Sequence, residues 1–170
     1  MDILFSHVSI VTMDERMSVW VDAFLGVTDG KIAYIGKNAP EEKPERILDG
    51  AGMVLMPGLV NCHTHLPMSL LRGYGEELPL SEWLSRSIFP QEERMDARSV
   101  KAAALLSIAE CLRFGVTSVS DMYFCSDAVA EAVAESGIKA NLCHAVTTDR
   151  TDDFDPDTDP DFREAEALHY

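Results

Sequence analysis

Aliphatic residues occupy every second position along residues 18–28, and the positions between them carry Ser18, Trp20, Asp22, Phe24 and Gly26. The apolar set comprises Val19, Val21, Ala23, Leu25 and Val27. A period of two is typical of a β-strand with one buried face. The dipeptide Asp29-Gly30 follows directly, and it favours a type I′ turn into a second strand at residues 31–35. With a further strand expected at residues 4–12, the pattern predicts a small β unit over residues 1–56.

Beyond residue 56 the hydrophobic period changes. Residues 99–114 carry an apolar stripe at helical spacing, made of Ala102, Leu105, Leu106, Ala109 and Leu112. Asp96 can cap this helix at its N-terminus, and Gly115 suits the position just after its end. The pattern therefore predicts an amphipathic helix that buries this stripe.

Three further elements follow in the same rhythm. Residues 116–122 read as a strand, residues 127–136 as a helix between Ser126 and Gly137, and residues 139–146 as another strand. Strands that alternate with helices are typical of a parallel sheet with right-handed crossovers. We therefore expect an α/β fold, with residues 57–170 as a second domain.

An apolar run at residues 57–62 ends in two histidines, His63 and His65. In a strand, side chains at i and i+2 share one face, roughly 7 Å apart along the chain. Two neutral imidazoles suit zinc or ferrous iron, but a catalytic zinc site needs at least three protein ligands and an open position. The other histidines form no second ligand pattern: His7, His144 and His169. The sequence thus predicts part of a metal site.

Composition and charge restrict the partners. Hydrophobic residues make up 46% of the chain, which is enough for a core, and 14 basic residues against 29 acidic ones leave a formal charge of −15. This charge repels nucleic acid and anionic membrane surfaces. The N-terminus lacks the basic and apolar regions of a signal peptide, and no apolar run approaches the ~20 residues of a membrane span. We expect a cytoplasmic protein without nucleic-acid or membrane partners.

The cysteines form no Cys-x-x-Cys pair, which favours reduced and mostly buried thiols. They are Cys62, Cys111, Cys125 and Cys143.

An acidic segment at residues 153–164 supplies a competing hypothesis. Six carboxylates match positions 1, 3, 5, 7, 9 and 12 of a calcium loop: Asp153, Asp155, Asp157, Asp159, Asp161 and Glu164. However, Thr158 replaces the template's glycine, and two prolines stiffen the segment. A solvated acidic connection is favoured, and a non-catalytic calcium-binding or interaction module stays open as an alternative of another class.

Several motifs in order resemble a known family. The stretches VTDGKIAYIG (27–36), ILDGAGMVLM (47–56) and PGLVNCHTH (57–65) resemble the amino-terminal signature of the amidohydrolase superfamily. LLRG (70–73), LPLSEWL (78–84) and FPQE (89–92) are similar to its methylthioadenosine/S-adenosylhomocysteine deaminase branch and to chlorohydrolase relatives. The resemblance extends over about residues 2–148.

The resemblance implies a fold. Residues 1–56 would form part of a composite β-sandwich, and residues 57–170 would form the first three βα units of a TIM-type (β/α)₈ barrel, which takes about 250 residues in full. The family's remaining ligands, histidines after strands five and six and an aspartate after strand eight, have no counterpart here, and neither has its acid/base residue. We therefore expect an amino-terminal portion of a longer enzyme, with no catalytic residue assigned and no activity on its own.

The resemblance also implies roles for individual residues. His63 and His65 would bind one divalent metal, zinc in the first place and iron as an alternative. Glu92 would accept hydrogen bonds from ribose hydroxyls, and Trp83 would pack against a purine or thioether. His144 stands where related deaminases carry an arginine for a substrate carboxylate, and a histidine is a weaker substitute. The implied activity is hydrolytic deamination of an adenine nucleoside such as methylthioadenosine or S-adenosylhomocysteine.

Two matters stay open. A guanine deaminase or a triazine-type hydrolase acting on a C–N or C–Cl bond is the alternative within the superfamily. The partner is in each case a small molecule, and the full-length enzyme could also be a homo-oligomer.

Asp121, near the end of the strand at residues 116–122, is expected to have a structural hydrogen-bonding role.

Overall fold

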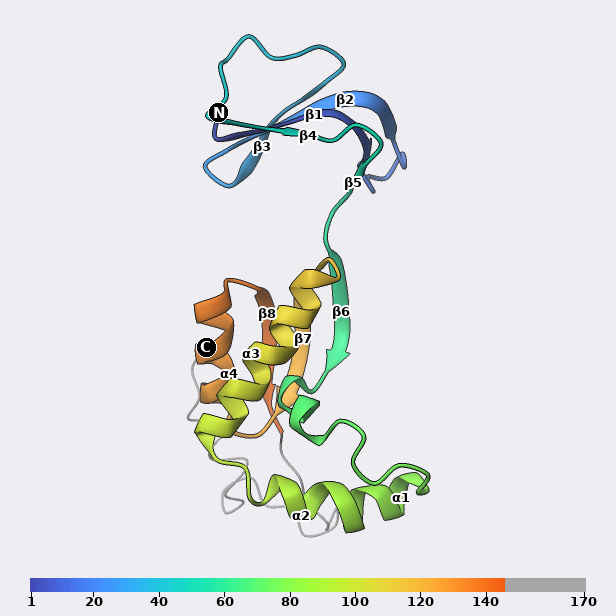
Figure 1. Ribbon diagram of the computed structural model, residues 1–170, viewed down its shortest axis with the longest axis vertical. Helices are drawn as coiled ribbons and strands as arrows, with labels where there is room; N and C mark the ends of the chain where they lie inside the picture. The colour runs from blue at the N-terminus through green and yellow to red at the C-terminus, as the bar shows by residue number, and fades with distance from the viewer. Residues whose placement is uncertain (146–170) are drawn as a thin grey trace. The chain divides into compact units, whose positions relative to one another are not determined.

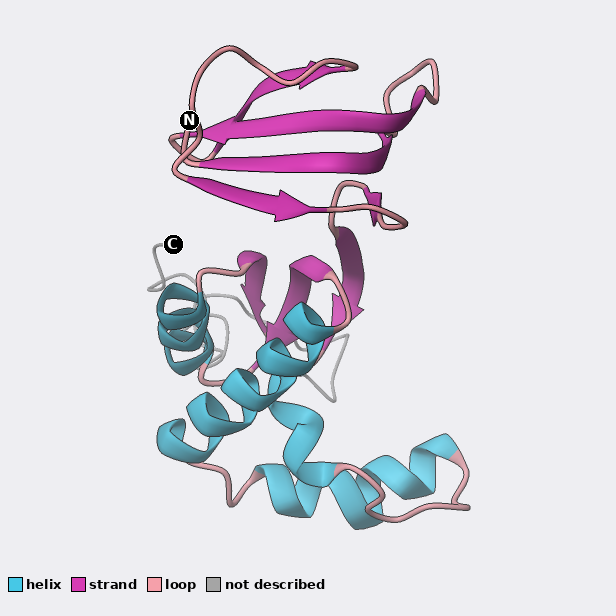
Figure 2. Cartoon of the chain, turned by 45° about the horizontal axis from the view of Figure 1, so that its top comes forward, coloured by secondary structure: helices cyan, strands magenta, loops and turns pink. Residues whose placement is uncertain are grey.

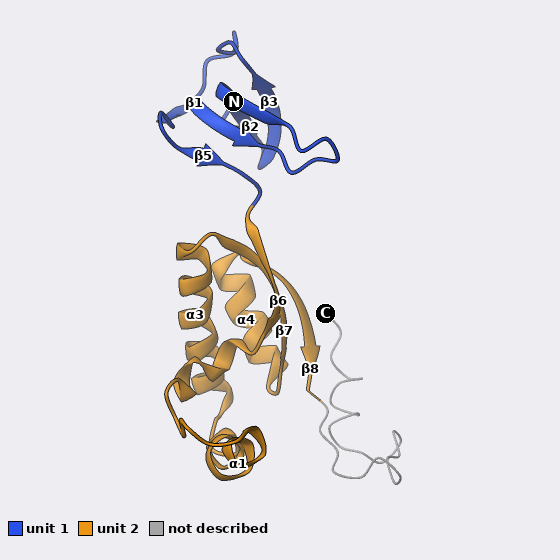
Figure 3. Ribbon diagram, turned by 90° about the vertical axis from the view of Figure 1, so that its right-hand side faces the viewer, with its two compact units in different colours: residues 1–57 blue, residues 58–170 orange. Residues whose placement is uncertain are grey.

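The computed structural model describes residues 1–145 (Figure 1). It has a mixed α/β composition with two separate sheets (Figure 2). Two compact units divide the chain, Met1–Pro57 and a unit that begins at Gly58 (Figure 3). The sequence placed this boundary after residue 56. The acidic residues of the calcium-loop hypothesis, 153–164, lie outside the described residues.

The first unit is one five-stranded sheet with the order β3-β2-β1-β4, in which β5 also pairs with β1. Its strands are β1 (Ile3–Val11), β2 (Val19–Thr28), β3 (Lys31–Gly36), β4 (Arg46–Asp49) and β5 (Val54–Leu55). Strand β2 runs antiparallel to β1 and β3, while β4 and β5 run parallel to β1. Val8, Ile10, Ala23 and Leu25 form its buried core.

The predicted hairpin is confirmed, because Asp29 and Gly30 have φ of 51° and 69° between β2 and β3, as a type I′ turn requires. The predicted buried face of β2 is wrong in its first half. Val19 and Val21 are 60% and 61% exposed, although Ala23 is fully buried. The register of β1 and β2 shifts beside Asp22, which has a φ of 51°, and this bulge reverses the faces of the residues before it.

The second unit is built on a parallel sheet with the order β6-β7-β8. Its strands are β6 (Leu59–Thr64), β7 (Val116–Tyr123) and β8 (Lys139–His144). The helices α3 (Ala97–Arg113) and α4 (Ser126–Ser136) make the crossovers and lie on one face of the sheet (Figure 3). The expected alternation of parallel strands and helices is thereby confirmed.

A further helical region connects β6 to α3. It contains a 3₁₀ segment (Leu66–Leu71), then α1 (Leu80–Trp83), a π-helical turn (Leu84–Ile88) and α2 (Phe89–Glu92). The last three form one continuous run in Figure 1. Since π-helical turns often occur at functional sites, this run is a candidate for one.

Capping residues explain where the crossover helices begin and end. Asp96 accepts the Ser99 backbone N–H at 2.8 Å, and the Ser99 hydroxyl accepts the Asp96 N–H at 2.9 Å, so the predicted cap of α3 is confirmed. The predicted cap of α4 is off by one residue. The N-cap position is Cys125, which has a φ of 50°, and Ser126 is the first residue of the helix. The Ser126 hydroxyl contacts His144 Nδ1 at 3.0 Å and does not cap the helix. Gly137 ends α4 with a φ of 75°, as expected.

The predicted buried stripe of α3 is wrong. The buried side chains are Val100, Ala103, Ala104 and Ile108, whereas Leu106 is 50% exposed and Leu112 is 43% exposed. Apolar residues occupy more than one face of this helix, so periodicity alone did not determine which face is buried. The two adjacent alanines permit a close approach to the 3₁₀ segment, where the Ser69 hydroxyl donates to the Ala103 carbonyl at 2.9 Å.

The cysteines are free thiols, but none is fully buried, contrary to expectation. Cys62 and Cys143 are exposed because the sheet of the second unit is covered by helices on only one face in the described part of the chain. Among residues 1–145, no helix combines the length and apolarity needed to cross a membrane.

Candidate metal and substrate site

The two histidines of the predicted metal motif meet at the carboxyl end of β6. His63 is the penultimate residue of β6, and His65 directly follows the last residue, Thr64. Their ring centroids are 5.1 Å apart with an interplanar angle of 79°. His63 is exposed and His65 is partly exposed, so both imidazoles are accessible to a ligand.

The orientation of His65 is set by the neighbouring strand. Its Nδ1 lies 2.7 Å from the backbone carbonyl oxygen of Met122 in β7. A carbonyl oxygen can only accept, so Nδ1 carries the proton and Nε2 keeps its lone pair. Histidines that bind metals commonly donate their other N–H to such an acceptor. The hydrogen bond to Met122 therefore leaves Nε2 of His65 unprotonated and able to bind a metal ion.

Asp121 holds the turn that follows His65. Its side chain is 2% exposed, and Oδ1 accepts the Leu66 backbone N–H at 2.6 Å. Burial raises the pKa of this carboxyl to about 6, although the Leu66 N–H and the nearby His65 lower it in part. The Leu66 carbonyl in turn accepts the Ser107 hydroxyl of α3 at 2.6 Å. These contacts agree with the structural role expected for Asp121.

Tyr123 ends β7 and brings a second polar residue to the site. Its side chain is 5% exposed, and its hydroxyl donates to Glu92 Oε1 at 2.7 Å. The Tyr123 ring lies 6.3 Å from the His65 ring and stacks on Phe124 at 4.2 Å. No motif or hydrophobic pattern in the sequence singled out Tyr123. A tyrosine on the buried face of a strand needs a partner for its hydroxyl, and this need was the available signal.

One pocket joins these residues. It has a volume of about 370 Å³ and is lined by His65, Trp83, Glu92 and Tyr123, together with apolar side chains of α1, the π-helical turn and α2. The Trp83 indole N–H donates to the Tyr74 carbonyl at 2.9 Å, which fixes the ring at the pocket wall. A mostly apolar pocket of this size with a few convergent polar groups is typical of a small-molecule site.

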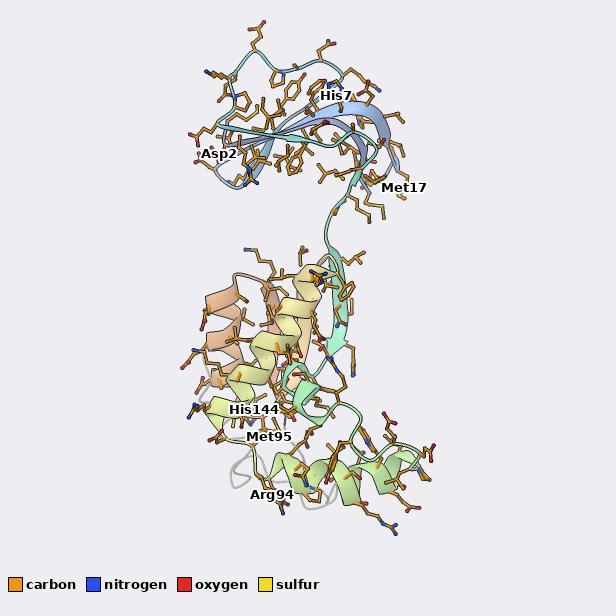
Figure 4. The ribbon with its side chains drawn as sticks, in the orientation of Figure 1. Asp2, His7, Met17, Arg94, Met95 and His144 are labelled. Carbon is orange, nitrogen blue, oxygen red and sulfur yellow. The ribbon has the colours of Figure 1, made fainter. Side chains whose placement is uncertain are left out.

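His144 lies at the end of β8 (Figure 4). Its Nδ1 is 3.0 Å from the Ser126 hydroxyl at the start of α4. The next residue, Ala145, lines the pocket. The structure therefore brings Trp83 and Glu92 to the same pocket as His65, and places His144 at its margin.

The donor set for a metal is incomplete in the described part of the chain. Within residues 1–145, no group of three or more histidine, cysteine, aspartate or glutamate side chains is arranged to hold an ion. His63 and His65 supply two imidazoles, which fit a borderline metal such as zinc, but a catalytic site needs a third protein ligand.

Residues 54–169 match the family model of the amidohydrolase family. This match extends over more than half of the chain, so the protein belongs to the amidohydrolase family, as its motifs indicated.

The chain is also similar to individual members. It is 40% identical over 145 residues to a 5'-deoxyadenosine deaminase of Methanosarcina acetivorans, covering 85% of this chain and 33% of that protein. It is 40% identical over 152 residues to a 5-methylthioadenosine/S-adenosylhomocysteine deaminase of Acetivibrio thermocellus, covering 88% and 35%. The crystal structure of a zinc-bound adenosine deaminase from Xanthomonas campestris superposes with a TM-score of 0.76 at 35% identity, covering 82% and 33%. The chain thus spans about a third of the length of the relatives it matches.

Proposed function

We propose that this chain is the amino-terminal third of a metal-dependent amidohydrolase that deaminates adenine nucleosides, a hydrolase acting on C–N bonds. The observation that carries the proposal is a pocket in the described residues that joins His65 to Trp83 and Glu92. The similarity to adenosine-type deaminases over most of the chain supports the same substrate class.

The unit from Gly58 would be the first three βα units of a TIM-type barrel, and the unit Met1–Pro57 would be part of a β-sandwich. The alternation along β7 supports the barrel. Val119, Asp121 and Tyr123 are buried toward the helices, while Met122 is on the opposite face and 44% exposed. The face opposite the helices, with Ser118, Ser120 and Met122, is left uncovered in the described residues, as expected for a strand whose inner face packs against side chains of the other strands of a closed barrel.

The proposed metal ligands are His63 and His65, with zinc as the first choice and iron as the alternative. A divalent metal at such a site supplies an activated water near neutral pH. The part played by this chain is to orient the imidazoles. The Met122 carbonyl holds the His65 ring, and Asp121 fixes the backbone that follows it.

Glu92 and Trp83 are the proposed substrate contacts. A carboxylate accepts two hydrogen bonds from a vicinal diol, so Glu92 suits a ribose. The Trp83 ring offers an apolar surface to a purine or thioether. We assign no carboxylate recognition to His144, because a histidine lacks the fixed charge and fork of a guanidinium. Methylthioadenosine and 5'-deoxyadenosine are therefore favoured over S-adenosylhomocysteine.

The test measures ammonia release by the full-length protein, or by a chimera in which this chain replaces the matching third of the Acetivibrio thermocellus relative. The panel contains methylthioadenosine, 5'-deoxyadenosine, S-adenosylhomocysteine, adenine and guanine. We expect turnover of the nucleosides and none of guanine. Faster turnover of a free base would contradict the proposal and favour the alternative class. The isolated chain should show no turnover above a metal-only background.

Two substitutions test the roles within the pocket. His65→Ala should lower zinc content and activity together. Glu92→Gln removes a charge-assisted acceptor worth about 1.5 to 3 kcal/mol, so kcat/KM for nucleosides should fall roughly 10- to 150-fold. Zinc content should not change in Glu92→Gln, and a loss of metal in that variant would refute the ribose assignment.

A further inference from the structure

We infer that Tyr123 is a positioning residue for substrate recognition: its hydroxyl holds one oxygen of the Glu92 carboxylate and leaves the other oxygen for the ribose diol. This inference rests on the proposed function and deepens it, because it assigns the fixed geometry of Glu92 to a residue that does not itself contact the sugar.

The contact is well defined. The Tyr123 hydroxyl donates to Glu92 Oε1 at 2.7 Å and also approaches the Met95 sulfur at 3.8 Å. A phenol has one proton to donate, and a carboxylate oxygen is a much stronger acceptor than a thioether. Among the described residues, the structure records no other hydrogen bond to the Glu92 carboxylate. Oε2 has no recorded hydrogen-bond partner among these residues, and Glu92 lines the pocket, so this oxygen has acceptor capacity left for a bound diol.

The tyrosine itself is held by burial. Its ring is 5% exposed and belongs to the buried cluster around Val119 and Val129 in the second unit. It comes from β7, whereas Glu92 is the last residue of α2, at the end of the helical run that begins at Leu80. Burial and the Glu92 carboxylate both raise the pKa of the Tyr123 phenol, so the hydroxyl stays a donor at neutral pH.

Fixing the carboxylate affects binding through entropy. A glutamate that becomes ordered only when the substrate binds loses rotamer freedom, and this loss weakens binding. A glutamate that is already ordered in the free enzyme avoids that loss, which is the benefit of preorganisation. Without the tyrosine hydroxyl, the Glu92 side chain would sample several rotamers, and the diol would bind more weakly.

A purely structural contact between α2 and β7 predicts a different outcome, since it would weaken every substrate alike. The test therefore compares adenosine with 2',3'-dideoxyadenosine, which lacks the diol, in the full-length protein or the chimera. For Tyr123→Phe we expect kcat/KM for adenosine to fall about 5- to 20-fold. The variant loses one charge-assisted hydrogen bond, which affects the substrate only through the position of Glu92. The change should be mainly in KM, and the dideoxy substrate should change less than about twofold.

Tyr34→Phe is the matched control. The Tyr34 hydroxyl also makes a 2.7 Å hydrogen bond, to the Asn38 carbonyl in the first unit. Its removal should leave the ratio of the two substrates unchanged. In a Glu92→Gln background, Tyr123→Phe should add little further loss of diol preference, because the tyrosine acts through the glutamate.

Replacing Tyr123 with 4-aminophenylalanine keeps a hydrogen-bond donor at this position and should retain most of the preference for adenosine. This second variant tests the inference even where Tyr123→Phe folds poorly. Equal losses on both substrates in Tyr123→Phe would overturn the inference. If the parent protein prefers adenosine and the Tyr123→Phe variant keeps that preference in full, the inference about Tyr123 is overturned, while the proposed function is not. A parent that uses both substrates equally would refute the role of Glu92 in the proposed function, and the inference with it.

Discussion

Burial of the Asp121 carboxyl predicts a pH-dependent cost to stability. Its folded pKa is raised from 3.8 to about 6, a difference of roughly two units, and each unit corresponds to about 1.36 kcal/mol. The folded state therefore binds a proton that the unfolded state has already released between pH 4 and pH 6. Over that range the contribution of Asp121 to stability falls as pH rises, by about 2 to 3 kcal/mol in total.

Asp121→Asn is the informative perturbation, because an amide oxygen can still accept the Leu66 N–H and carries no charge to desolvate. The free energy of unfolding of this variant minus that of the parent should grow by about 2 to 3 kcal/mol from pH 4 to pH 6 and stay constant above pH 7. Taking the difference removes the titration of the other carboxylates, which both proteins share.

The assay is urea unfolding of the metal-free chain, with a chelator present, followed by tryptophan fluorescence. Trp20 lies in the first unit and Trp83 in the second, so a Trp20→Phe background reports only on the unit that contains Asp121. A difference that is constant from pH 4 to pH 7 would show that the carboxyl ionises as in water. A difference that shrinks with rising pH would show that the Leu66 hydrogen bond dominates over burial, and would refute the reasoning.

Three further predictions use the same fluorescence assay. Ile108 is 1% exposed, so Ile108→Ala should lower the free energy of unfolding by about 2 to 5 kcal/mol. Leu106→Ala on the same helix should lower it far less, because Leu106 is 50% exposed. Equal losses would contradict the observed buried face of α3. Asp96→Ala should cost about 1 kcal/mol through loss of the cap, and no change in the urea midpoint would contradict this. Gly137→Ala should cost roughly 1 kcal/mol, because Gly137 has a φ of 75°, and a stabilised variant would show that α4 ends differently.

Local chemistry explains which parts of the fold could be predicted from the sequence. The hairpin at Asp29-Gly30 and the cap at Asp96 depend on neighbouring residues only, so each could be identified without a tertiary context. The metal motif likewise needs only a strand and a spacing of two, and His63 and His65 do meet.

The features that were missed depend on pairing between distant segments. The bulge at Asp22 lies opposite His7, and both residues have a left-handed backbone conformation. His7 Nδ1 and Asp22 Oδ1 contact each other at 2.8 Å across the two strands. The hydrogen bond from Tyr123 to Glu92 joins residues 31 positions apart. Neither partner reveals such a contact in its own local pattern, since the contact exists only after the sheet has formed.

The carboxyl end of β7 serves the site through three successive residues, by the side chain of Asp121, the carbonyl of Met122 and the side chain of Tyr123. Because faces alternate at every residue, inserting or deleting one residue in this strand would exchange all three roles at once. The loop at residues 72–79 makes none of these three contacts, although its Tyr74 carbonyl holds the Trp83 indole and its Arg72 pairs with Glu110, so its length can vary only between those two residues and the start of α1. Evolution of new substrate preferences on this framework would therefore proceed by insertions in that loop and by side-chain changes in the helices beside it, while the length of β7 stays constant.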